Sequence, residues 1–208
     1  MESNVGFGFR PNELSDTLRS NFIGVVVFAE FPCDCVICRK GKERLEQIGS
    51  RPRTERVHLI IKPITQYNEL QHAWYNVSRV KWSAFGGFVL ALDKLGFTTD
   101  KETPSEQWKD VKNFLVGKAF EFTSENPVKF VEDLTGQKRP RRLPPALVEA
   151  KEQWFPIRVV SEDELKNYTI DDLQTIFERG KAEVEDLFRR FETEEISIEE
   201  FEEFSAFQ

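Results

Sequence analysis

Three cysteines that fall within six residues are the part of this sequence whose types and spacing could do chemistry. Cys33, Cys35 and Cys38 form a C-x-C-x-x-C pattern, and the chain has no other cysteine. In structural sites Zn²⁺ takes four tetrahedral ligands, which are usually thiolates and imidazoles. We expect His58 to be the fourth ligand, because a hairpin of the two flanking strands returns it beside the cysteines. His72 is the alternative.

The cysteines lie in a polar connection between two predicted strands, at residues 32–55. Such a connection is too long and too polar to be ordered by packing, and a metal ion that closes it offsets the entropy of the loop. We therefore predict a structural Zn²⁺ in this insertion. The alternatives are reduced thiols without a metal and a single redox thiol, whereas an iron–sulfur cluster usually requires four cysteines.

Charge is distributed unevenly along the chain. Residues 160–208 hold 16 of the 36 acidic residues and only 5 of the 29 lysines and arginines, so the body is mildly basic and the tail acidic. Clustered, unpaired cysteines argue against a secreted disulfide framework. The longest apolar run, Phe22–Ala29, is far shorter than a membrane span, and the N-terminus does not resemble a signal peptide. We expect a soluble, cytoplasmic protein.

Runs of β-branched and aromatic residues predict five strands, over residues 22–30, 56–63, 72–79, 114–123 and 154–160. The second strand alternates, which predicts that Val57, Leu59 and Ile61 face the core while Arg56, His58 and Lys62 face solvent. A short helix is predicted over residues 42–48 and a longer one over residues 82–95. Three strands, a helix and two strands is the order of elements in an OB barrel. We predict a mainly β fold over residues 1–160: a five-stranded OB-type barrel with a helix between strands three and four.

The acidic tail, residues 161–208, is predicted to be a separate α-helical extension. Ser161 and Glu164 have the spacing of a capping box. An apolar stripe follows at helical spacing, and it consists of Leu173, Phe177, Val184, Phe188 and Phe191. Phe201, Phe204 and Phe207 then recur among glutamates. These three are predicted to bind a protein partner, and the alternative is a solubilising helix.

Aromatic residues interleaved with cations indicate binding of single-stranded nucleic acid, which is held by basic grooves with aromatic stacking platforms. Because Tyr75 is in phase with Val77, we expect Trp74 to face outward and stack on a base. Four cations fall within residues 138–142, in a connection that commonly closes over the ligand in OB barrels. A flexible basic loop without a specific role is the alternative. The predicted nucleic-acid contacts are Arg56, Lys62, Trp74, Arg79, Lys81, Lys118, Lys138, Arg139, Arg141 and Arg142.

The run from Trp82 to Gly96, followed by Leu115-Val-Gly-Lys-Ala-Phe120, resembles a pattern of uncharacterised archaeal and phage-type OB proteins presumed to bind single-stranded DNA. In those proteins a "kW..F...L..LG" helix precedes an "LVGK.F" strand. The resemblance covers about residues 22–160 and implies an OB fold and single-strand binding. The acidic tail is similar to the partner-recruiting tails of bacterial single-strand-binding proteins, but it closes on Phe207-Gln208 instead of Pro-Phe.

The sequence thus favours a single-stranded DNA-binding protein that acts in replication, repair or recombination by base stacking and phosphate neutralisation. RNA is an open alternative ligand. One competing hypothesis is a zinc-stabilised protein–protein adaptor. Another is a thiol or metal enzyme, but the chain has no phosphate loop or nucleophile motif and only two histidines, which leaves little for acid–base catalysis. We therefore expect no enzymatic activity.

Overall fold

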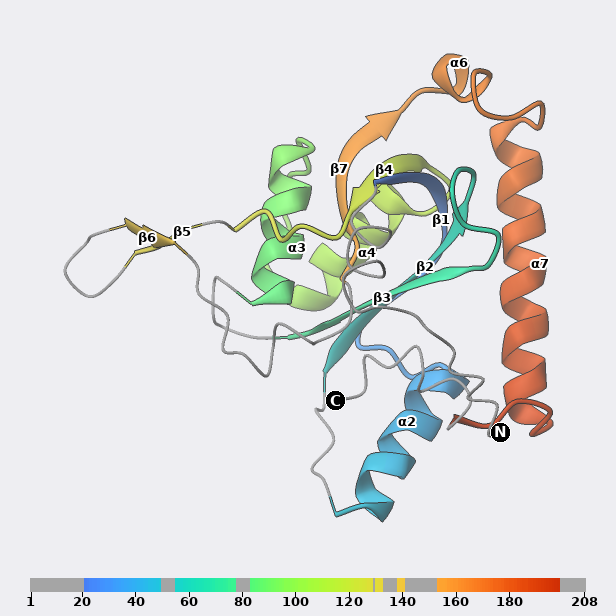
Figure 1. Cartoon of the computed structure of the whole chain (residues 1–208). Helices are drawn as coiled ribbons and strands as arrows, with labels where there is room; N and C mark the ends of the chain where they lie inside the picture. The colour runs from blue at the N-terminus through green and yellow to red at the C-terminus, as the bar shows by residue number, and fades with distance from the viewer. Residues whose placement is uncertain are drawn as a thin grey trace, which may run out of the picture.

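The computed structural model describes residues 21–49, 55–77, 83–128, 130–132, 138–140 and 153–198. Its centre is a five-stranded sheet in the order β3-β2-β1-β4-β7, with every neighbouring pair antiparallel (Figure 1). The strands span Phe22–Glu30 (β1), Arg56–Pro63 (β2), Gln71–Asn76 (β3), Ala119–Thr123 (β4) and Phe155–Val160 (β7). The prediction of five strands is confirmed, but the sheet is not closed into a barrel, because β3 and β7 remain its edges.

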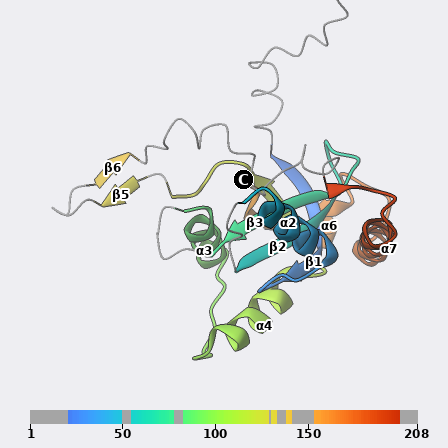
Figure 2. The same ribbon diagram turned by 90° about the horizontal axis from the view of Figure 1, so that it is seen from below.

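Helices flank both faces of this sheet. They are α2 (Val36–Gln47), α3 (Ala84–Lys94), α4 (Pro104–Leu115), α6 (Glu162–Leu165) and α7 (Leu173–Glu192). A short hairpin of β5 (Phe130–Glu132) and β6 (Lys138–Pro140) interrupts the connection between β4 and β7. Figure 2 shows α7 on one side of the sheet and α3 and α4 on the other. Helices on both faces mean that the sheet is the middle layer of a mixed α and β fold.

Helix α4 extends to Leu115 and so includes residue 114, where the sequence predicted the start of a strand. Its start is well specified: the Thr103 side chain caps the helix by accepting a hydrogen bond from the backbone N–H of Glu106, and Pro104 follows directly. Val111 and Leu115 are buried on one face of the helix. The apolar run that suggested a strand is therefore the last turn of an amphipathic helix, and β4 begins only at residue 119.

The face of the sheet toward α3 and α4 carries the largest apolar core, to which all five strands contribute. Tyr75 of β3 stacks on Phe88 of α3, with ring centroids 4.4 Å apart. Its hydroxyl donates a hydrogen bond to the backbone carbonyl of Trp154, the residue before β7. The two edge strands are thus linked by side chains and by α3, instead of by a backbone ladder.

The opposite face is covered by α7, which packs its apolar stripe against β1 and β2. Gly180 permits a close approach: a Cβ atom there would lie 2.7 Å from Val27 Cγ1 and 2.8 Å from Lys62 Cβ. The predicted amphipathic tail helix is confirmed. The prediction that alternate residues of the second strand face solvent is wrong, because Arg56 and His58 are buried beneath the covering helices.

Two further features of the sequence have a structural explanation. Ser161 caps α6 by accepting a hydrogen bond from the backbone N–H of Glu164, which is one half of the predicted capping box; the Glu164 carboxylate accepts from Arg158. Gly87 lies against Asn126, whose Oδ1 would be 2.5 Å from a Cβ atom at position 87, so the glycine accommodates this side chain. Among the described residues, no helix combines the length and the apolar character needed to cross a bilayer.

Candidate metal centre

Cys33, Cys35, Cys38 and His58 come together where β1 passes into α2. Their ligand atoms, three sulfurs and one imidazole nitrogen, all lie within 4.8 Å of one another. His58 Nδ1 is 3.4 Å from Cys35 Sγ, 3.7 Å from Cys33 Sγ and 3.8 Å from Cys38 Sγ. The prediction of these four residues as one cluster is confirmed.

Local structure explains why the cysteine spacing works. Cys35 is the N-cap residue of α2 and Cys38 lies in its first turn, so a spacing of three residues places both sulfurs on one side of the helix. Cys33 is fixed to the second strand by its backbone N–H, which donates to the carbonyl of Arg56 at 2.9 Å. In the antiparallel pairing of β1 with β2, His58 lies opposite Glu30, the last residue of β1. The hairpin therefore returns the histidine to the cysteines, as the sequence predicted.

The chemistry of this donor set fits a structural Zn²⁺, which prefers tetrahedral sulfur and nitrogen ligands in closed sites. All three cysteines have free thiols. The ligand atoms are buried, although the Cys35 residue as a whole is partly exposed. We conclude that the chain has a Cys₃His metal-binding cluster, consistent with a structural zinc site. When bound, the ion would supply a cross-link between β1, α2 and β2.

The electrostatic surroundings favour a thiolate at Cys38. Hydrogen bonds with Cys33 and Cys35 lower the pKa of the Cys38 thiol, and Arg56 and Trp74 act in the same direction. Hydrogen bonds with Cys35 and Cys38, together with burial, raise the pKa of the Cys33 thiol. Three thiolates and a divalent ion leave one negative charge, which the buried Arg56 guanidinium can offset. Arg56 is only 6% exposed, and its Nε donates to Asn76 Oδ1 at 3.1 Å.

The two histidines have different places in the centre. His58 Nε2, the nitrogen that faces away from the cysteines, lies 3.0 Å from His72 Nδ1. His72 is therefore behind His58 and is not one of the four clustered ligands. Burial, with a contribution from His58, holds the pKa of His72 well below its usual value. Of the two candidate histidines, His58 is the ligand that the geometry supports.

Trp74 is also part of this centre and not of the surface. It is 3% exposed and stacks on His58, with ring centroids 4.7 Å apart and an interplanar angle of 14°. The prediction that Trp74 faces outward as a stacking platform is wrong. The alternation of β3 correctly separated Trp74 from Tyr75, but both faces of the strand are covered, so neither ring is available to a base.

The other predicted nucleic-acid contacts lie in several places. Lys62 forms an ion pair with Glu183 of α7 at 2.7 Å, and its side chain is 15% exposed. Lys118 is exposed, with its Nζ 4.8 Å from the centroid of the Phe114 ring. Lys138 and Arg139 belong to β6. The remaining predicted residues lie outside the described part of the chain, and they are Arg79, Lys81, Arg141, Arg142, Phe201, Phe204 and Phe207.

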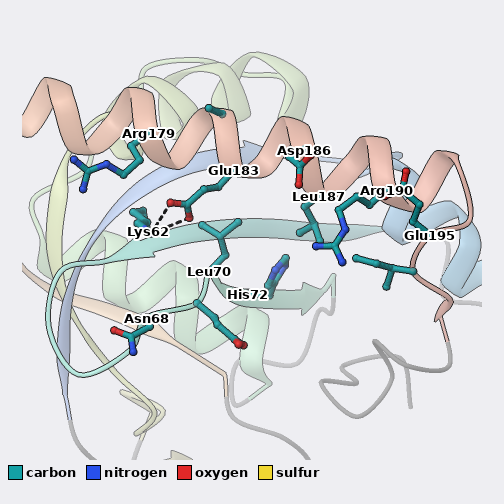
Figure 3. Close-up of a pocket in the computed structure, with 13 residues that line it drawn as sticks. Lys62, Asn68, Leu70, His72, Arg179, Glu183, Asp186, Leu187, Arg190 and Glu195 are labelled. Atoms are coloured by element: carbon teal, nitrogen blue, oxygen red, sulfur yellow. Dashed lines mark hydrogen bonds and ion pairs between the residues drawn. The ribbon is translucent and has the colours of Figure 1, made fainter.

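A groove of about 950 Å³ separates α7 from the ends of β2 and β3, with Lys62 and His72 on its sheet side (Figure 3). Its charges are largely compensated within α7 and the sheet. Glu183 neutralises Lys62, and Arg189 pairs with both Asp186 and Glu195. The groove therefore offers no strongly basic lining for a phosphate backbone.

One contact that the sequence did not predict joins two distant segments. Asn126, which follows β4, donates from Nδ2 to the carbonyl of Ser83 at 3.3 Å, just before α3. Its Oδ1 accepts from the backbone N–H of Val128 at 2.9 Å. Nothing in the sequence identified Asn126 as the partner of this segment.

Comparison with protein-family models, with curated proteins and with solved structures found no match to this chain. The function proposed for it therefore depends on its fold and on its metal centre.

Proposed function

We propose that this chain is a zinc-stabilised OB-type module that binds single-stranded nucleic acid, with DNA as the expected ligand. The strand order supports the OB assignment. In an OB fold the first three strands form a meander, the fourth pairs with the first, the fifth pairs with the fourth, and a helix lies between the third and fourth. The order β3-β2-β1-β4-β7, with α3 after β3, has this connectivity. OB barrels are often only partly closed.

The surface that OB proteins commonly use includes the outer face of strands two and three and the connections after strands one and four. Here α7 packs over the outer face of β1 and β2, and Glu183 already neutralises Lys62. The connection after β1 contains the metal centre. The connection after β4 is therefore the best candidate for nucleic-acid contact, and it contains the four cations of residues 138–142.

The observation that carries the proposal is the contact between Asn126 and Ser83. Arg79 and Lys81 lie two to four residues before Ser83 in the sequence, and Asn126 lies near the start of the connection that contains the four cations of residues 138–142. The contact thus joins a residue that follows one cation-bearing segment to a residue that precedes the other. The hairpin β5–β6 then extends from the body of the fold (Figure 1). Two basic segments connected through such a contact could follow one phosphate backbone, since such binding is mainly electrostatic.

The test is fluorescence anisotropy with labelled single-stranded DNA, single-stranded RNA and duplex DNA at several salt concentrations. We expect the single strands to bind and their affinity to fall with salt. Replacing Lys138, Arg139, Arg141 and Arg142 together by alanine should weaken binding and reduce the salt slope by up to about 3, because each phosphate contact on a single strand contributes about 0.7 to it.

A matched control removes the same number of cations from the α3–α4 side of the fold. It replaces the exposed lysines Lys94, Lys101, Lys109 and Lys112 by alanine, and it should keep most of the affinity. The proposal fails if the zinc-loaded protein binds none of the three nucleic acids, or if the two quadruple variants weaken binding equally. A folded protein that binds no nucleic acid would favour the adaptor hypothesis.

A further inference from the structure

We infer that His72 is the positioning residue of the metal centre: its Nδ1 accepts a hydrogen bond from Nε2–H of His58 and thereby presents the Nδ1 lone pair of His58 to the ion. This role concerns the metal centre alone and does not depend on nucleic-acid binding. It also explains why the only two histidines of the chain lie next to each other, although the cluster uses just one of them.

The orientation of the His58 ring determines which of its nitrogens can bind the ion. Its Nδ1 faces the three sulfurs at 3.4–3.8 Å, while Nε2 points to His72 Nδ1 at 3.0 Å. A neutral imidazole has one nitrogen that donates and one that accepts. If Nδ1 binds the ion, the proton must be on Nε2. That N–H is buried, and leaving it without an acceptor would be costly.

The acceptor for this N–H is a ring nitrogen of His72. A ligating histidine in metal sites almost always donates its other ring N–H to an outer partner, which fixes the tautomer and the ring orientation. The partner is commonly a carboxylate, a backbone carbonyl or water. In this protein the atom at hydrogen-bonding distance is His72 Nδ1. An imidazole partner, unlike a carboxylate, adds no negative charge to a centre whose ligands include three cysteine sulfurs.

Stacking alone does not determine which ring nitrogen of His58 faces the ion. Trp74 stacks on both histidines, with centroids 4.7 Å from His58 and 5.1 Å from His72 and interplanar angles of 14° and 15°. Phe28 contacts the His58 ring edge-to-face, with centroids 5.7 Å apart. These contacts hold the plane of the His58 ring, but a ring flipped within that plane would keep them. Such a flip exchanges Nε2 with Cε1 and Nδ1 with Cδ2, so only the observed orientation lets an N–H donate to His72 while Nδ1 faces the sulfurs.

The test compares His72→Asn with His72→Leu. Asparagine can place its Oδ1 near the position of the histidine Nδ1 and so retains the acceptor, whereas leucine has a similar size and no acceptor. Zinc affinity is measured by competition with a chromophoric chelator. We expect His72→Leu to bind Zn²⁺ about 10–100-fold more weakly, the range typical for loss of an outer-shell partner. His72→Asn should recover most of that loss, and Gln71→Leu on the same strand serves as the control.

Equal losses in the Asn and Leu variants would show a packing role and would overturn the inference, as would the absence of any loss. A second measurement on the unmodified protein removes the dependence on variants that fail to fold. In the cadmium-loaded protein, NMR coupling between ¹¹³Cd and the imidazole nitrogens should identify Nδ1 of His58 as the ligand, with a slowly exchanging proton on Nε2. Coupling to Nε2 of His58, or to either nitrogen of His72, would contradict the assignment.

Discussion

The two faces of the sheet are stabilised in different ways. The face toward α3 and α4 is an apolar core to which every strand contributes, including Phe22, Phe120 and Phe122. The other face has two parts: aliphatic packing of α7 on β1 and β2, and the metal cluster packed against the end of α7. In the first face many side chains share the stabilisation. On the second face, the stabilisation depends largely on the four residues of the metal cluster.

The metal cluster links parts of the chain that would otherwise have few contacts. Phe191 and Ile198, at and beyond the end of α7, belong to the same cluster of buried residues as Cys33 and Cys38. Phe28 contacts both His58 and Phe188, with ring centroids 5.7 Å and 5.4 Å away. The first half of α7 packs instead on aliphatic residues of the sheet through Ile176. We therefore expect the two halves of α7 to respond differently to loss of the metal.

The largest effect is expected for Cys38→Ser. This change removes a buried sulfur ligand, so Zn²⁺ binding should be lost and α2 and residues 186–196 should exchange amide hydrogens much faster. The unfolding free energy should fall by several kcal/mol. It should fall by less than the roughly 10–16 kcal/mol that zinc contributes to zinc-finger peptides, because the apolar core does not depend on the metal. The measurement is hydrogen–deuterium exchange with mass spectrometry.

Chelation of the wild-type protein is the control for this variant, and it should give the same pattern of exchange. Residues 173–184 and β4 should remain protected in both cases. Exchange that rises uniformly over all five strands would contradict the division into two differently stabilised faces.

A smaller effect of a different kind is expected for Phe122→Ala. Phe122 is fully buried and stacks on Phe22 with ring centroids 5.2 Å apart. The cavity left by the ring should lower the unfolding free energy by about 3–5 kcal/mol, measured by denaturant titration. Zinc affinity of the folded protein should stay within a few-fold of the wild type, because the ring faces away from the cluster. A large loss of zinc affinity would show that the two faces are coupled.

The smallest effect is expected for Gly180→Ala. The new methyl group would meet Val27 and the Lys62 side chain at 2.7–2.8 Å, which pushes α7 away from the sheet. Overpacking of this kind costs about 1–3 kcal/mol, and the higher helix propensity of alanine offsets about 1 kcal/mol of it. We expect a net destabilisation of up to about 2 kcal/mol in thermal or denaturant unfolding.

Gln174→Ala, at an exposed position of the same helix, is the matched control and should change stability by no more than about 0.5 kcal/mol. A more stable Gly180→Ala variant would mean that α7 is loosely docked. That result would also reopen the outer face of the sheet as a possible nucleic-acid surface.

Prediction from sequence succeeded best where the determinants are local. The C-x-C-x-x-C spacing together with one hairpin was enough to predict the four residues of the metal cluster. The helix that contains Cys38 and is capped by Cys35 was predicted too late in the chain, from residue 42 instead of Val36. Its first turn contains Val-Ile-Cys, whose branched side chains lower helix propensity. Packing of Val36 and Ile37 in the cluster around the cysteines overrides that preference.

Prediction failed where a residue's surroundings come from far along the chain. Arg56 and Trp74 look like nucleic-acid contacts in the sequence, because a cation and an aromatic ring on a strand are typical of such surfaces. In the structure they are buried beside the cysteines, where Arg56 provides charge and Trp74 stacks on the ligand histidine. Alternation tells which side of a strand a residue faces, but not whether that side is covered.

Patterns within a few residues, or within one hairpin, were enough to predict the five strands, the residues of the metal cluster and the amphipathic helix at the acidic end. Only the tertiary structure shows that this helix covers the second face of the sheet, that His72 lies behind His58, and that Asn126 contacts Ser83. These features depend on contacts between residues up to more than a hundred positions apart. Such contacts leave no periodic pattern in the sequence, because either partner can be any residue of suitable size and polarity.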